Sequence, residues 1–237
     1  MTQSEYTPRR KFVLRLGLAA GAATIGSHST LRAAKEKEPT LEKPDDILQR
    51  LIAGNQRFIN GKTNLAPRTP ADFSRDALGQ SPPAIILGCA DSRVPPEFVF
   101  DQPIGQLFVL RVAGNIVGSG PILQGSIEFA VAELGARLII VMGHSACGAC
   151  KAAIEHIENN DALPGSIEGM VDYIRPVVRN VKGTAGDKLV NVTKENARLG
   201  AKRLETAGPI LPGFINRGEL KAVAAYYELS TGKVEFL

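Results

Sequence analysis

The 237-residue sequence contains no tryptophan, and only 5% of its residues are aromatic. A surface that stacks nucleic-acid bases needs aromatic side chains, so this composition argues against one. Internal repeats and low-complexity tracts are also lacking. The remaining composition, with 44% hydrophobic and 22% charged residues, is typical of a globular chain that can bury a sizeable core. The length predicts one domain with short appendages.

Net charge is small and unevenly distributed. The formal net charge is +4, and residues 1–34 carry five basic residues against one acidic residue. The rest of the chain is therefore close to neutral. A partner rich in negative charge, such as nucleic acid, is poorly supported by this distribution.

Cysteine is scarce: the chain has three, at Cys89, Cys147 and Cys150. An odd number does not make a disulfide framework, even in an exported protein. At least one thiol must have another role, and metal binding is the leading explanation.

The sequence also has no apolar run long enough to span a bilayer. Its N-terminus carries Arg9, Arg10 and Lys11 before a short, mildly apolar run, and small residues around Ala33–Ala34 could mark a cleavage site. The paired arginines resemble a twin-arginine export signal. We expect residues 1–34 to direct export, most simply to the periplasm, and residues 35–43 to be a linker. A disordered basic tail is the alternative.

Short, continuous apolar runs predict buried strands at 84–89, 107–110, 138–142 and 222–227, with an edge strand at 234–236. Helical spacing of apolar residues predicts helices at 44–60, 121–135, 147–159, 166–181 and 187–206. The alternation predicts an α/β fold with a mainly parallel central sheet of about four or five strands, flanked by helices. The 44–60 helix would form an N-terminal arm that packs on its own domain or on a second subunit.

Two segments hold nearly all the reactive groups, and each follows an apolar strand. The first runs from Cys89 to Arg93 and the second contains His144 and Cys147. Functional groups gather at the carboxyl ends of strands in open α/β sheets, so these two segments can meet. Two thiolates and one imidazole suit a catalytic zinc ion, which takes three protein ligands and leaves a fourth position for water.

Asp91 and Arg93 lie two and four residues after Cys89. If the segment is extended, all three side chains share one face. An arginine fork holds a carboxylate with two hydrogen bonds, which would keep Asp91 ionised and oriented toward bound water. A structural ion pair that closes a turn is the alternative.

Cys150 lies three residues after Cys147, at an expected helix start. We expect it to pack behind the metal site. A redox pair with Cys147, a substitute fourth ligand and an oxidation-sensitive neighbour are the alternatives. Gly114 and Asn115 are expected to form tight backbone near the site, because the lysine of a phosphate-binding loop is missing.

The stretches CADSRVPPE and GHSACGAC, with RVAGNIV and GSIEFAVAELGARLIIVMGHS between them, resemble the beta-class carbonic anhydrases. The resemblance covers about residues 44–237, which would form the catalytic domain. It implies a zinc-dependent enzyme that reversibly hydrates carbon dioxide to bicarbonate and a proton by zinc-bound hydroxide. It also implies that Cys89, His144 and Cys147 bind one Zn²⁺ per chain, and that Asp91 and Arg93 form a catalytic dyad.

The same resemblance implies a substrate-binding group of Gln80, Phe108 and Phe129, although plant-like members often carry tyrosine at the last position. Ile86 replaces the tryptophan of a regulated subgroup, so the form with an open fourth position is expected. The implied assembly is a homodimer or a higher even oligomer, with the 44–60 helix embracing its partner. Related folds hydrolyse carbonyl sulfide or carbon disulfide, which leaves a second enzymatic reading. A non-catalytic zinc-binding or redox module is a third.

Overall fold

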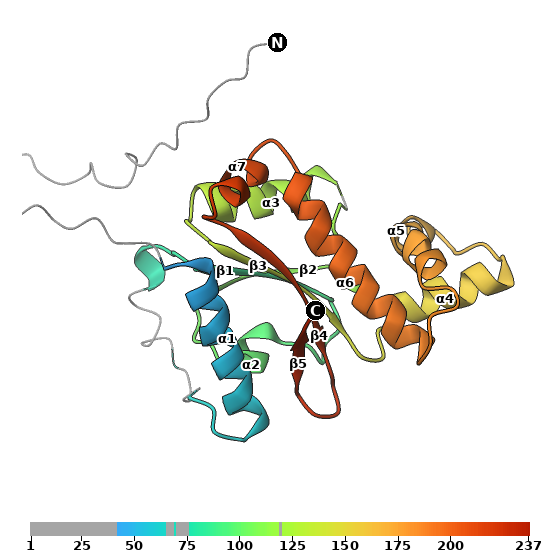
Figure 1. Cartoon of the computed structure of the whole chain (residues 1–237), viewed down its shortest axis with the longest axis horizontal. Coiled ribbons are helices and arrows are strands. Elements are labelled where there is room, and N and C mark those ends of the chain that lie inside the picture. Colours follow the sequence, from blue (N-terminus) through green and yellow to red (C-terminus); the bar gives the residue numbers. More distant parts are fainter. Residues whose placement is uncertain (1–41, 65–68, 70–75, 119) are drawn as a thin grey trace, which may run out of the picture. The chain divides into compact units, whose positions relative to one another are not determined.

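A computed structural model describes most of the chain (Figure 1). The described residues are 42–64, 69, 76–118 and 120–237. The predicted export segment 1–34 lies outside them, as does most of the predicted linker 35–43. Residues Glu42–Leu237 belong to one compact unit. Within the described part, none of the helices combines the length and apolarity needed to cross a bilayer.

A five-stranded sheet forms the centre of this unit, in the order β2-β1-β3-β4-β5. The first four strands are parallel, and β5 runs antiparallel to β4. The strand bounds are β1 Ala84–Gly88, β2 Leu107–Arg111, β3 Leu138–His144, β4 Lys221–Tyr227 and β5 Val234–Phe236. This confirms the predicted mainly parallel sheet. Parallel pairing also places the carboxyl ends of β1 and β3 side by side, with Gly88 opposite Met142.

The central strands β1 and β3 are buried along their whole length. Strand side chains alternate between faces, so Ile85 and Leu87 join one core cluster while Ala84 and Ile86 join another. Burying one such aliphatic side chain contributes about 1.5–3 kcal/mol. Hydrophobic burial on both faces therefore fixes the strand ends from which the reactive segments leave.

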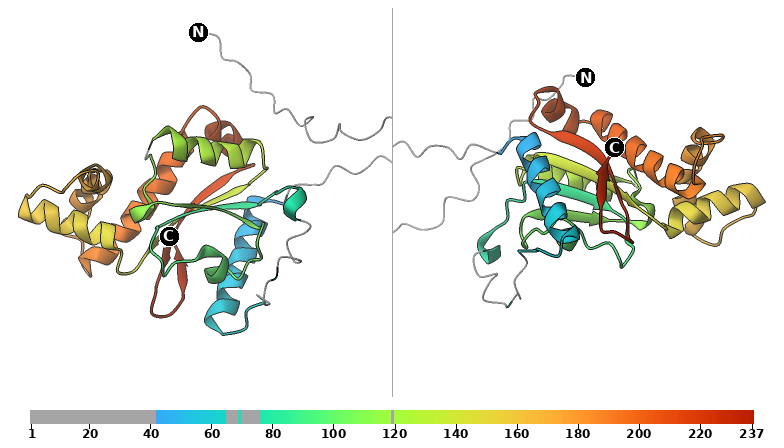
Figure 2. Two further views of the ribbon diagram at one scale, coloured as in Figure 1. Left: turned by 180° about the vertical axis from the view of Figure 1, so that it is seen from behind. Right: turned by 60° about the horizontal axis from the view of Figure 1, so that its bottom comes forward.

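Helices cover both faces of the sheet (Figures 1 and 2). Helices α1 and α2 lie on one face and α3, α6 and α7 on the other, whereas α4 and α5 pack around the segments that follow β1 and β3. The bounds are α1 Pro44–Ile59, α2 Pro96–Val99, α3 Pro121–Ala132, α4 Gly148–Asn159, α5 Ile167–Asn180, α6 Lys188–Thr206 and α7 Leu211–Asn216, with 3₁₀ turns η2 Asp76–Leu78 and η3 Ala113–Asn115.

All five predicted helices are present, with bounds that differ by a few residues. The sequence analysis missed α2 and α7, which have four and six residues. A helix this short completes at most two turns, so it leaves little 3.6-residue periodicity to detect. Asp76–Leu78, ahead of β1, form a 3₁₀ turn.

Helix α1 packs on the sheet of its own chain. Pro44 starts it at a position where no backbone N–H is needed, and Ile47 and Leu51 are fully buried. A Cβ atom on Gly54 would lie 1.9 Å from the carbonyl oxygen of Phe100, so only glycine allows this approach. The buried apolar side chains of α1 therefore pack against the core of their own domain, which was one of the two alternatives expected from the sequence.

Helix α6 carries polar side chains to the back of the reactive segments. The Asp187 carboxylate caps its first turn by accepting a hydrogen bond from the Val190 N–H at 2.8 Å. Gly200 lets the helix approach Val141 of β3, because a Cβ there would lie 2.9 Å from its Cγ1. The helix thereby brings Thr193 and Asn196 into the interior, where both are buried.

Candidate metal centre

Three ligand-type side chains from separate elements converge at the carboxyl end of the sheet. Cys89 directly follows β1, His144 is the last residue of β3, and Cys147 is the N-cap of α4. Their two sulfur atoms and one imidazole nitrogen all lie within 4.8 Å of one another, and all three residues are buried. Adjacent parallel strands explain the convergence, because their carboxyl ends meet at one edge.

The His144 ring is oriented for a metal. Its Nδ1 atom lies 2.9 Å from the Ser145 carbonyl oxygen, which can only accept, so Nδ1 carries the proton. The opposite Nε2 is buried without a hydrogen-bond partner in the described part of the chain. A lone pair left bare in the interior is costly unless it has a ligand. A cation beside the two sulfurs would satisfy it.

Contacts between the thiols, together with burial, favour the protonated form of Cys89 and Cys147 when no cation is bound. The contact with Cys147 and burial raise the pKa of Cys89 to about 12. The contact with Cys150 and burial likewise raise the pKa of Cys147 to about 12. Two adjacent thiolates are therefore unfavourable alone, and a divalent metal removes that penalty. Sulfur and imidazole donors in this set fit zinc.

The backbone at Gly114 closes the site from behind. Its N–H donates to the Cys89 sulfur at 3.3 Å, and its carbonyl accepts from the Asn196 side chain at 2.7 Å. Gly114 has a φ of 71°, and a Cβ there would lie 2.9 Å from Ile174 Cδ1. The expected tight backbone near the site is thus present, and it supplies a hydrogen bond to a ligand sulfur.

Asp91 and Arg93 form a doubly hydrogen-bonded pair beside the three ligands. Arg93 Nε donates to Asp91 Oδ1 at 2.9 Å, and its Nη2 donates to Oδ2 at 2.7 Å. This contact holds the pKa of Asp91 well below its usual range. Asp91 Oδ2 lies 3.9 Å from His144 Nε2. The carboxylate therefore borders the ligand set and remains ionised.

The local conformation differs from the extended segment assumed above. Residues 92 and 93 form a turn in which the Val94 N–H donates to the Asp91 carbonyl at 3.1 Å. The Arg93 N–H also donates to Asp91 Oδ1 at 2.9 Å. The expectation that an extended backbone puts Cys89, Asp91 and Arg93 on one face is therefore wrong. The turn itself brings the two side chains together, because aspartate readily bonds the backbone two residues ahead.

Arg111 is a residue that the sequence analysis missed. It ends β2, and its Nε donates to the Cys89 carbonyl at 2.8 Å while Nη2 donates to the Asp91 carbonyl. It therefore fixes the backbone that leads from β1 into the turn, at Cys89 and at Asp91. Its position directly after the apolar run 107–110, at the carboxyl end of a predicted strand, could have indicated a role near the site.

Cys150 lies fully buried in α4 and is not part of the three-residue ligand set. It packs with Cys147 among the apolar residues of α4, α5 and α6. The contact with Cys147 lowers the pKa of Cys150. This placement matches the expected position behind the metal site, and the three cysteines are unbridged.

The three residues expected to bind substrate lie on segments other than those that carry the ligand set. Gln80 is exposed and precedes β1, Phe108 pairs with Ile85 near the amino end of β1, and Phe129 on α3 is 50% exposed. Ile85 and Cys89 are separated by four residues, or about 13 Å of strand. Within one chain, Phe108 is therefore not brought to Cys89.

Comparison with known proteins identifies similar chains. The sequence profile of the family described as "Carbonic anhydrase" matches residues 84–234. "Carbonic anhydrase 2" of Mycobacterium tuberculosis is 44% identical over 184 residues, covering 77% of this chain and 87% of the relative. The carbonic anhydrase of Synechococcus elongatus is 30% identical over 195 residues, covering 79% of this chain and 70% of the relative.

Solved structures have a similar fold. The beta-carbonic anhydrase CcaA superposes with a TM-score of 0.63 at 29% identity, covering 80% of this chain and 98% of that one. A tetrameric beta-carbonic anhydrase from Sordaria macrospora gives a TM-score of 0.65 at 25% identity, covering 81% and 97%.

Proposed function

The chain belongs to the beta class of the carbonic anhydrases, and on that premise we propose how its residues divide the work of the reaction. It is a zinc-dependent carbonate dehydratase that interconverts carbon dioxide and bicarbonate. We assign the metal to Cys89, His144 and Cys147. The observation that carries this assignment is the convergence of their ligand atoms within 4.8 Å. When bound, zinc acts as a Lewis acid that makes hydroxide available from water near neutral pH.

Asp91 orients the attacking water in this proposal. An ionised carboxylate only accepts hydrogen bonds, so its free lone pairs can accept one from the water and turn a lone pair of the water oxygen toward carbon dioxide. Its position 3.9 Å from His144 Nε2 supports this role. Arg93 acts through Asp91, because its two hydrogen bonds keep the carboxylate charged and fix its plane.

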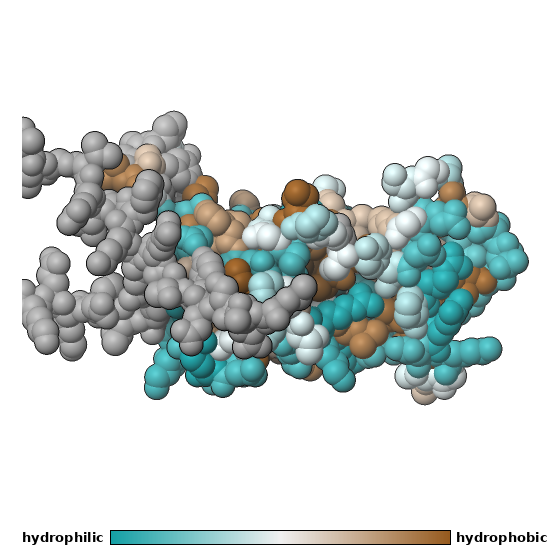
Figure 3. Space-filling model, turned by 90° about the horizontal axis from the view of Figure 1, so that it is seen from above, coloured by the Kyte–Doolittle hydropathy of each residue, from teal (hydrophilic) through white to brown (hydrophobic). Residues whose placement is uncertain are grey.

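Gln80, Phe108 and Phe129 act on the site of a second copy. The pairing of Phe108 with Ile85, about 13 Å of strand from Cys89, supports this assignment. The exposed apolar side chains of Leu78, Ile122 and Phe129, at 90%, 83% and 50%, also support it. Apolar side chains also lie among polar ones on the face shown in Figure 3. Contiguous exposed apolar patches mark interaction surfaces, and we propose that these side chains contribute to one. A homodimer, or an even oligomer built from it, would place the amide of Gln80 near the substrate.

Residues 1–34 serve as a cleaved twin-arginine signal that sends the folded enzyme to the periplasm. The paired Arg9 and Arg10 before a short apolar run support this part of the proposal. Replacing both with lysine should leave the full-length protein in the cytoplasmic fraction. Equal amounts of processed protein outside the cytoplasm in native and variant cells would refute it.

Stopped-flow carbon dioxide hydration tests the enzymatic assignment. Native protein should be active, and the Cys89→Ser variant should lose both zinc and activity. Full activity in Cys89→Ser and in Asp91→Asn would refute the assigned roles.

A further inference from the structure

One carbonyl group holds the His144 ring in place. In the described structure, Nδ1 has one hydrogen-bond acceptor, the Ser145 carbonyl oxygen at 2.9 Å. Second partners of this kind set the tautomer and orientation of a ligating histidine. Whatever fixes Ser145 therefore fixes the direction in which Nε2 points.

Ser145 is tied to the β4–β5 hairpin through both its backbone and its side chain. Its N–H donates to the Tyr227 carbonyl at 2.9 Å. Its hydroxyl donates to Glu228 Oε1 at 2.8 Å and accepts from the Leu229 N–H at 2.9 Å. The hydroxyl thus bridges the segment after β3 to the turn after β4.

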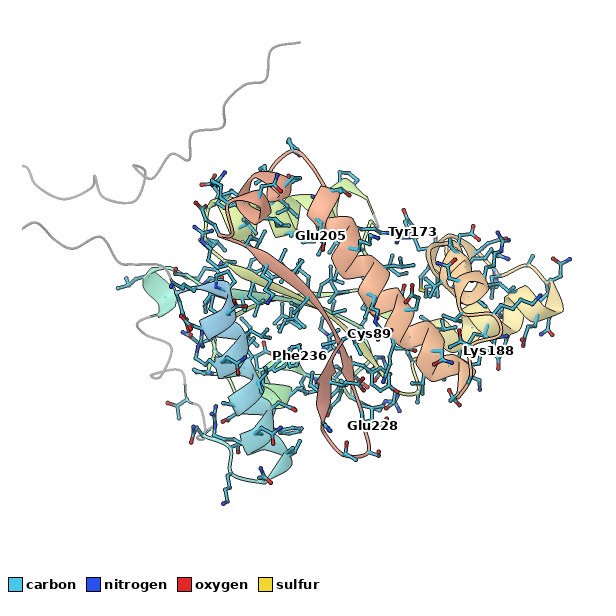
Figure 4. The ribbon with its side chains drawn as sticks, in the orientation of Figure 1. Cys89, Tyr173, Lys188, Glu205, Glu228 and Phe236 are labelled. Atoms are coloured by element: carbon cyan, nitrogen blue, oxygen red, sulfur yellow. The ribbon has the colours of Figure 1, made fainter. Side chains whose placement is uncertain are left out.

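Glu228 is the fixed end of this bridge. Its Oε1 also accepts from the Ser230 N–H at 3.2 Å and from the Ser230 hydroxyl at 3.0 Å. Three donors on one carboxylate oxygen hold it firmly, because hydrogen bonds to an ionised acceptor are about twice as strong as neutral ones. Cys89 and Glu228 are labelled in Figure 4, where the hairpin extends past the end of the sheet.

We infer that Ser145 and Glu228 are positioning residues for the metal ligand His144. The Glu228 carboxylate holds the Ser145 hydroxyl, the Ser145 carbonyl holds Nδ1–H, and Nε2 is thereby aimed at the metal before it binds. The inference rests on His144 ligating zinc, as proposed above. If the bridge only closed the hairpin, its loss would lower stability without changing zinc affinity or the coordination geometry.

Zinc affinity, measured by competition with a chromogenic chelator on the full-length protein, separates the two roles. Ser145→Ala removes the bridge and should weaken zinc binding about 10–100-fold, the range for loss of such outer partners. Glu228→Gln keeps an oxygen but loses the charge, so its loss should be smaller. Ser145→Thr retains the hydroxyl and should bind zinc as the native protein does. The control is Glu235→Gln, which removes an exposed ion pair to Lys194 on the same hairpin.

Cobalt substitution supplies a readout of geometry. The visible absorption of the Co²⁺ protein should shift in Ser145→Ala and stay unchanged in Ser145→Thr and Glu235→Gln. Native zinc affinity and a native cobalt spectrum in Ser145→Ala, even with a lower melting temperature, would overturn the inference. A His144→Ala variant tests the premise separately: if it binds zinc as tightly as the native protein, His144 is not a ligand and the inference falls with its premise.

Discussion

The two ends of the sheet differ in kind. At the carboxyl end, Cys89, His144 and Cys147 are buried and their ligand atoms meet. At the amino end, Gln80 is exposed and Phe108 lies about 13 Å of strand away from Cys89. The three candidate metal ligands thus meet within a single chain, whereas Phe108, proposed to bind substrate, lies far from them.

This difference indicates that one chain can assemble the metal ligand set without a partner. Parallel strands end together, so the metal set assembles from local geometry. In the proposed dimer, the residues at the amino end would act on the metal site of the second copy. Metal binding and substrate binding should therefore be separable by mutation, and separable between subunits.

The largest effect should come from a ligand at the carboxyl end. Cys89→Ser replaces a thiolate donor with a poorly ionised hydroxyl, so zinc affinity should fall by more than about 100-fold, the upper end for outer partners. Hydration activity should fall with it. Gln80→Ala at the amino end is the matched control, and metal analysis should find it zinc-loaded. Equal zinc content in the two variants would contradict the claim that Cys89 binds zinc and Gln80 does not.

Asp91→Asn should keep zinc and lose catalysis. The amide can donate a proton toward the water, so the orienting acceptor is lost and kcat should fall about 100-fold. The control is Glu219→Gln before β4, because Arg217 and Glu219 form a similar two-bond pair at the amino end. Native activity in Asp91→Asn, or an equal loss in Glu219→Gln, would contradict a specific role for the carboxyl-end pair.

Mixing two weakened variants tests the division between subunits. Gln80→Ala impairs the partner's site and Asp91→Asn impairs its own, so a mixed dimer contains one site with both native residues. Unfolding and refolding the two variants together should give more activity than the sum of the separately refolded samples. No gain, with mixed dimers demonstrated by mass spectrometry, would show that Gln80 does not act across the interface.

Cys150→Ala should have the smallest effect. Its sulfur packs behind the site and is outside the ligand set, so zinc content and activity should stay near native. Removing it leaves a small cavity, and thermal unfolding should show a stability loss of about 1 kcal/mol. Loss of zinc in this variant would indicate that Cys150 is a ligand, which would contradict its separation from Cys89, His144 and Cys147.

Sequence patterns predicted the sheet and the convergence of Cys89, His144 and Cys147, because apolar runs and strand-end residues reflect local rules. Cys89 and His144 each directly follow or end a buried run, and that signal was sufficient. Arg111 and Glu228 escaped notice because their roles depend on which strand lies beside which, a property that periodicity does not encode. The conformation of 91–94 was also missed, because the hydrogen bond that the Asp91 carboxylate accepts from the Arg93 N–H favours a turn over an extended segment.

X-ray absorption at the zinc edge of the purified native protein tests the central claim most directly. Ligation by Cys89, Cys147 and His144 predicts two sulfur neighbours at about 2.3 Å and one imidazole nitrogen at about 2.0–2.1 Å, with one further light atom from outside the chain. A third sulfur neighbour, or the lack of an imidazole signal, would contradict the account.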